Sequence, residues 1–99
     1  MADLVLRAQR VLLDGEFRPA SVAVTGGVIT DVGEVDADAR APIQIDVPAQ
    51  AVLLPGFVDT HVHVNEPGTD WEGFETATAA ASVAGITTIV DMPLDCRPV

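Results

Sequence analysis

Two histidines, His61 and His63, have the residue type and spacing in this chain that best suit a chemical task, and they end an apolar run. Successive side chains of a β-strand point to opposite faces, so residues two positions apart project the same way. Two imidazoles that converge in this manner can share one metal ion. Asp59 and Asn65 have the same parity, which would add a carboxylate and an amide to that face.

The sequence around the histidines resembles a known enzyme family. Residues 52–63, VLLPGFVDTHVH, resemble the opening metal motif of the amidohydrolase superfamily. Residues 65–74 and 85–94 resemble its allantoinase branch. A histidine pair at this spacing is by itself weak evidence, because most such pairs are surface or packing residues. The flanking motif favours metal ligation.

The resemblance implies a (β/α)₈ barrel, and it makes His61 and His63 ligands of the first of two divalent metal ions. Zinc is the expected metal, although paired histidines also suit cobalt, nickel, manganese or iron. The implied substrate is a small cyclic ureide or amide, and the implied reaction is ring opening of allantoin to allantoate. The complete enzyme is expected to be a homo-oligomer, a homotetramer by family. We assign no catalytic residue within this chain.

Asn65 is the first candidate for a substrate contact, and the alternative is a turn residue before Glu66-Pro67-Gly68. Dihydroorotase-like relatives typically have arginine here, which suits a carboxylate. Asparagine suits a neutral ureido ring better. Allantoinase-like sequences usually carry one more residue after the position of Gly68, so this loop is shorter.

Three aspartates are further candidates. Asp59 is expected either to orient a metal ligand or to cap local backbone. Asp91 ends a predicted strand, and it either faces the mouth of the active site or makes a structural hydrogen bond. Asp95 lies near the expected substrate mouth, where relatives usually have asparagine, and is a second candidate substrate contact.

The chain has 99 residues, whereas a complete (β/α)₈ barrel takes ~250. We therefore expect an N-terminal piece of a larger fold. The family also uses a carboxylated lysine and later histidines, and this chain has two histidines and no lysine. The isolated chain is thus expected to be inactive. The alternatives are a dihydroorotase or hydantoinase-type hydrolase and a non-catalytic fragment or scaffold.

The net charge of −10 argues against nucleic acid or an anionic membrane as partner, since both select basic surfaces. No uninterrupted apolar stretch approaches the ~20 residues of a membrane span, and no signal-peptide pattern opens the chain. We expect a cytoplasmic location. Cys96 has no partner cysteine and is expected to be a free thiol.

The expected fold class is α/β, and the two parts are residues 1–50 and 51–99. Residues 1–50 read as a small antiparallel β unit, the N-terminal portion of a β-sandwich. Asp14-Gly15 and Gly26-Gly27 mark its turns. Residues 43–47 alternate apolar and polar, which predicts a strand with one buried and one solvent-exposed face. Residues 34–42 are expected to form a surface loop.

Residues 51–99 read as the first strand, first helix and second strand of an incomplete barrel. The strands are expected at 52–58, broken by Pro55-Gly56, and at 86–92. Both are expected to be buried on both faces in the complete barrel and exposed where the barrel is not closed. Thr69-x-x-Glu72 predicts a capping box before a helix from about Trp71 to Ala84. Gly85 is placed to end that helix.

Overall fold

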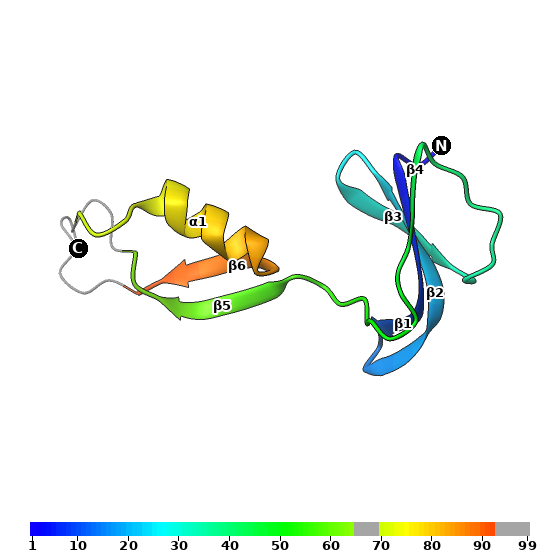
Figure 1. Ribbon diagram of the computed structural model, residues 1–99, viewed down its shortest axis with the longest axis horizontal. Helices are drawn as coiled ribbons and strands as arrows, with labels where there is room; N and C mark the ends of the chain where they lie inside the picture. Colours follow the sequence, from blue (N-terminus) through cyan, green and yellow to red (C-terminus); the bar gives the residue numbers. More distant parts are fainter. Residues whose placement is uncertain (65–69, 93–99) are drawn as a thin grey trace. The chain divides into compact units, whose positions relative to one another are not determined.

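The computed structural model describes residues 1–64 and 70–92, and the chain divides into two compact units between Pro55 and Gly56 (Figure 1). Each unit has its own sheet. The division of the sequence into domains at 1–50 and 51–99 stays a prediction. Among the described residues, no helix has the length and apolar character needed to cross a membrane.

The first unit is a four-stranded sheet in the order β3-β2-β1-β4. Its strands are β1 (Leu4–Leu13), β2 (Glu16–Thr25), β3 (Val28–Gly33) and β4 (Ile43–Asp46). Both predicted turns are confirmed, because Asp14 and Gly15 have φ of 51° and 80°, and Gly26 and Gly27 have φ of 59° and 78°. Positive φ at both central residues gives a two-residue turn whose twist matches its strands.

The expectation of a purely antiparallel unit is wrong for β4, which pairs in parallel with β1 through Leu4 and Ile43. β3 and β4 run in the same direction, so residues 34–42 must return along the sheet between them. The Arg7 guanidinium holds that return segment. Its Nη2 donates to the Ala37 and Ala39 carbonyls at 3.3 and 2.6 Å.

The core of this unit lies between β1 and β2, where paired residues share a face. It contains Ala8, Val11, Ala20 and Val22. The expected half-buried character of β4 is wrong, since all four of its residues are exposed. β4 is an edge strand, and none of the described residues forms a second layer over it.

Leu53 also belongs to the first unit, because its N–H donates to the Arg10 carbonyl and its carbonyl accepts from the Leu12 N–H. The predicted break at Pro55-Gly56 is therefore confirmed, whereas the predicted start of the strand at residue 52 is wrong. Pro55 has no N–H to donate to a ladder, and the next strand begins only at Phe57.

The second unit is a β-α-β element, as predicted, with β5 (Phe57–Val62), α1 (Phe74–Val83) and β6 (Ile86–Asp91). β5 and β6 pair in parallel, and α1 packs against β6 (Figure 1). The Gly85 N–H donates to the Ser82 carbonyl, which confirms the predicted helix end.

The predicted helix start is wrong. α1 begins at Phe74, and its N-cap is Gly73, whose φ of 94° cannot continue a helix to earlier residues. Glu72 therefore precedes the helix, and none of the side chains that the structure describes caps the start of α1. Thr69 lies outside the described residues.

The strands of this unit are largely exposed, as expected where the barrel is not closed, and their burial in the complete barrel stays a prediction. Phe57 and Val58 are each 57% exposed, and Val64 is the one buried hydrophobic among the described residues of the unit. A single helix covers only one side of two strands, so the remaining apolar side chains face solvent.

Candidate metal centre

The carboxyl end of β5 brings the two histidine rings together, as their parity predicts. His61 lies in the strand, and His63 follows its last residue, Val62. The two Nε2 atoms are 3.2 Å apart, and the rings meet edge to face with centroids 5.0 Å apart. Both side chains are exposed. The convergence is therefore a property of the structure, whereas metal ligation by the pair stays a prediction.

The distance between the two nitrogens fits a shared ion. Two nitrogens that each lie ~2.05 Å from zinc at the tetrahedral angle are ~3.3 Å apart. The observed 3.2 Å differs little from this value, so the separation of the two nitrogens suits one shared ion.

The tautomer of His63 is set by the backbone. Its Nδ1 lies 2.8 Å from the Met92 carbonyl oxygen, which can only accept, so Nδ1 must carry the proton. In the neutral ring, Nε2 then carries the lone pair that a metal needs. A ligating histidine usually donates its other N–H in this way.

Asp59 and Asp91 both contact the backbone around the histidines. Asp59 Oδ1 accepts the His61 N–H at 3.1 Å, and Asp91 Oδ1 accepts the Val64 N–H at 2.8 Å. These contacts agree with the capping and hydrogen-bonding alternatives for the two residues. Their roles in orienting a ligand stay predictions.

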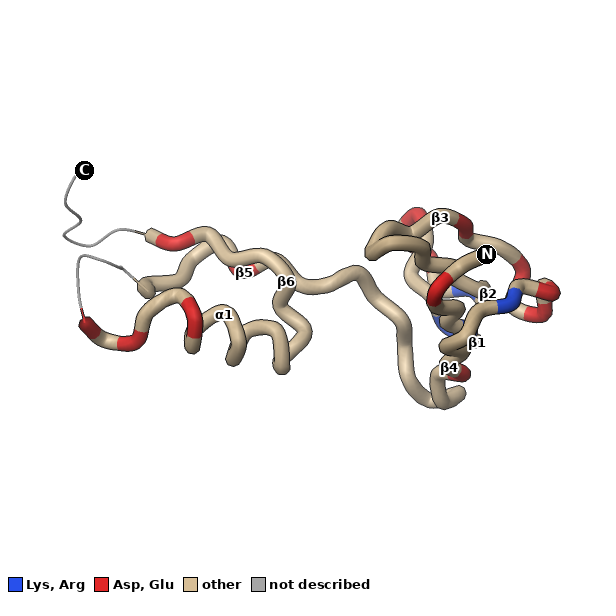
Figure 2. Tube along the Cα trace, turned by 90° about the horizontal axis from the view of Figure 1, so that it is seen from above, with Lys and Arg blue, Asp and Glu red and all other residues tan. Residues whose placement is uncertain are grey.

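The charge of the second unit favours a cation. The described part of the second unit carries acidic side chains and neither lysine nor arginine, as Figure 2 shows. The acidic residues are Asp59, Asp70, Glu72, Glu75 and Asp91. Within residues 1–64 and 70–92, however, no three histidine, cysteine or acidic side chains gather as a metal site. Further ligands would have to come from elsewhere.

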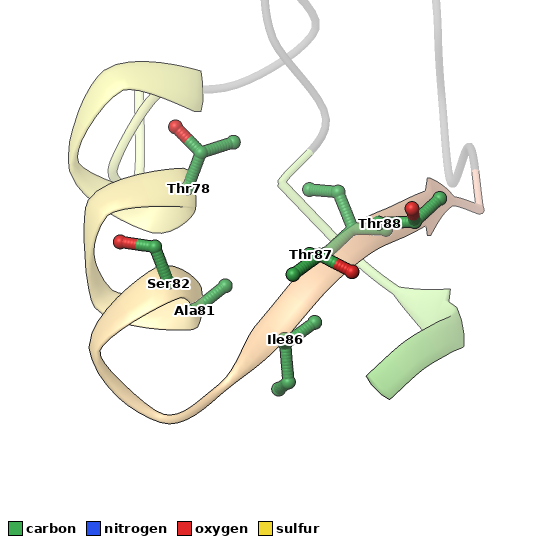
Figure 3. Close-up of a pocket in the computed structure, with 7 residues that line it drawn as sticks. Thr78, Ala81, Ser82, Ile86, Thr87 and Thr88 are labelled. Carbon is green, nitrogen blue, oxygen red and sulfur yellow. The ribbon is translucent and has the colours of Figure 1, made fainter. Parts of the chain in front are cut away.

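The other predicted site residues, Asn65 and Asp95, lie outside the described residues. A pocket of about 400 Å³ lies between α1 and β6 (Figure 3). Its described lining includes Thr78, Ser82 and Ile86 but neither histidine, so this pocket is separate from the candidate metal centre.

Sequence reasoning missed one group of the candidate site, the Met92 carbonyl that contacts His63 Nδ1. Every residue has a carbonyl, so no side-chain type marks it. Only the parallel pairing of β5 with β6, which brings residue 92 beside residue 63, could have revealed it.

Known proteins match this chain along nearly its whole length. The model of the amidohydrolase family matches residues 52–98. An allantoinase from Streptomyces avermitilis is 56% identical over 97 residues, which are 97% of this chain and 22% of the relative. The structure of an L-hydantoinase (dihydropyrimidinase) from Arthrobacter aurescens matches with a TM-score of 0.78 and 30% identity, over 94% of this chain and 21% of that one.

A D-aminoacylase with a binuclear metal center also matches, with a TM-score of 0.70 and 30% identity, over 92% of this chain and 18% of that one. The chain thus spans about a fifth of the length of these relatives.

These findings confirm the predicted fold: a small sheet and the first β-α-β unit of an amidohydrolase barrel. Within that family the chain is allantoinase-like, and it corresponds to the N-terminal portion of its relatives.

Proposed function

We propose that this chain supplies the first metal-binding pair of a hydrolase that opens the ring of allantoin. The single observation that carries the proposal is the pair of Nε2 atoms 3.2 Å apart, with His63 held by the Met92 carbonyl. The 56% identity to an allantoinase supports the substrate.

In this proposal, His61 and His63 hold one divalent ion, for which we propose zinc, in a site that is binuclear in the complete enzyme. A divalent metal bound in such a site lowers the pKa of water and polarises the amide carbonyl that is attacked. The chain's own part is to present two nitrogens at a fixed separation. The remaining ligands and the general base would come from outside these 99 residues.

Binding has a consequence for His61. In the metal-free pair, neutral His63 accepts at Nε2, so His61 donates the Nε2 proton across 3.2 Å. To ligate through Nε2, His61 must carry its proton on Nδ1 instead. We therefore propose that His63 already has the tautomer that a metal needs, and that His61 changes tautomer when the metal binds.

Asn65 is proposed to contact the substrate, and its lack of charge favours a neutral ring over a carboxylate-bearing one. Asp95 remains a proposed second contact. A hydantoinase-type reaction is the second candidate, because the L-hydantoinase structure superposes on the chain with a TM-score of 0.78. On the family resemblance we also propose a cytoplasmic homo-oligomer.

A chimera tests the proposal. Residues 1–99 would replace the matching fifth of the Streptomyces avermitilis allantoinase, and turnover of allantoin, hydantoin and dihydroorotate would be compared. We expect allantoin to be preferred, His63→Ala to abolish turnover, and Asn65→Arg to shift the preference toward dihydroorotate. Gln9→Ala, an exposed change on β1, is the matched control. A chimera whose His63→Ala variant keeps full activity would contradict the proposal.

A further inference from the structure

Three hydrogen bonds join the ends of β5 and β6 around His63. The Met92 N–H donates to the Val62 carbonyl at 2.7 Å, and the Val64 N–H donates to Asp91 Oδ1 at 2.8 Å. His63 Nδ1 donates to the Met92 carbonyl at 2.8 Å. We call these three bonds the strand-end clasp.

The clasp holds His63 from both sides along the chain. Val62 and Val64 flank the histidine, and each is tied to the end of β6. The two Met92 bonds use backbone groups and the imidazole ring. Asp91 supplies the only side chain outside the histidine that takes part in the clasp.

We propose that Asp91 is a positioning residue for metal uptake, which keeps His63 Nδ1 on the Met92 carbonyl and Nε2 turned toward His61 by accepting the Val64 N–H. This inference rests on the proposed metal-binding function of the pair. Without the Asp91 acceptor, the Val64 N–H loses this hydrogen bond, and the chain beyond Val62 is held less firmly to β6.

The role of Asp91 is that of a hydrogen-bond acceptor. Its Oδ1 accepts the Val64 N–H. Within residues 1–64 and 70–92, Asp91 belongs to no group of three candidate metal ligands. An asparagine has an oxygen in the same place but no charge. Asp91→Asn should therefore preserve the clasp, whereas Asp91→Ala should break it.

The expected effect on metal binding is about tenfold. Loss of the group that orients a metal-ligating histidine typically lowers metal affinity by 10 to 100-fold. Asp91 acts on His63 through one backbone amide, so the lower end of that range applies.

The test uses the 99-residue chain with two measurements. Nitrogen-15 NMR without metal reports which nitrogen of His63 carries the proton. Titration with Co²⁺, followed by its visible absorption, gives the affinity. Gly56→Ala is the control for general loosening of the second unit, because Gly56 lies against Thr87 and away from the clasp.

We expect the wild type and Asp91→Asn to show one Nδ1-protonated form of His63 and equal affinities. Asp91→Ala should show mixed tautomers and about tenfold weaker Co²⁺ binding, while the folded fraction of Gly56→Ala keeps the single tautomer. An Asp91→Ala chain with the wild-type tautomer and affinity would overturn the inference, and so would an Asp91→Asn chain that behaves like Asp91→Ala. If no variant binds Co²⁺ but the tautomers follow the expected pattern, the positioning role stands and the proposed function fails.

Discussion

Gly56 lies so close to the Thr87 side chain that it leaves no room for a Cβ, and replacing this glycine by alanine gives a sharp test of the fold. A Cβ at residue 56 would lie 2.8 Å from Thr87 Cβ, and closer still to Thr87 Cγ2 and Oγ1. These atoms belong to a β-branched side chain that is stiff at χ1, so they cannot swing away freely. The start of β5 would have to move from β6.

The expected cost follows from overpacking, which typically destabilises by about 1–3 kcal/mol. The Phe57 N–H donates to the Gly85 carbonyl at 2.9 Å, directly beside the clash. If opening of β5 exposes this amide, its hydrogen exchange should speed up roughly 5 to 150-fold, because 1.4 kcal/mol corresponds to a factor of ten. Amides of β1 in the first unit serve as the internal reference.

Gly33→Ala is the matched control, since its Cβ would meet the nearest side-chain atoms at 3.5 and 3.6 Å, which is ordinary contact. We expect no change in exchange there. Gly56→Ala combined with Thr87→Gly should restore slow exchange at Phe57. Unchanged exchange in Gly56→Ala alone would show that β5 and β6 do not pack as the structure has them.

Three other outcomes follow from the structure. Arg7→Met should speed amide exchange in residues 34–42 and lower the free energy of unfolding by about 1–3 kcal/mol, because the Arg7 guanidinium donates to two carbonyls of that segment. Equal exchange in the wild type and the variant would refute this. The 99-residue chain should hydrolyse no allantoin above a metal-only blank, since it holds two histidines and no lysine, and saturable turnover would be the contrary result. The chain should self-associate more as salt rises, because screening weakens its −10 charge while Phe57 and Val58 stay exposed, whereas sedimentation as a monomer at every salt concentration would rule this out.

The features predicted from sequence are those fixed by neighbouring residues. Gly26-Gly27 dictates a turn because few other pairs accept positive φ, and the parity of His61 and His63 follows from the period of a strand. Gly85 ends the helix for a similarly local reason. The β-α-β order is read from alternating apolar and helical segments along the chain.

The features that were missed depend on distant residues. Nothing within residues 43–46 distinguishes a parallel from an antiparallel partner, so the pairing of β4 with β1 was not predictable from that segment. Leu53 pairs with β1 although it continues an apolar run toward β5. In the candidate metal centre, the Met92 carbonyl contacts His63 from 29 positions away in the sequence. It is a backbone group, so the residue type at position 92 does not predict the contact.

X-ray absorption of the zinc-loaded chain tests the central claim most directly, because it reports the number and distance of imidazole ligands. The account predicts two imidazole nitrogens at about 2.0–2.1 Å from one ion per chain. It predicts one such nitrogen in His61→Ala and in His63→Ala, and none when both are replaced. Imidazole scattering that is the same in the wild type and the His63→Ala chain would contradict it.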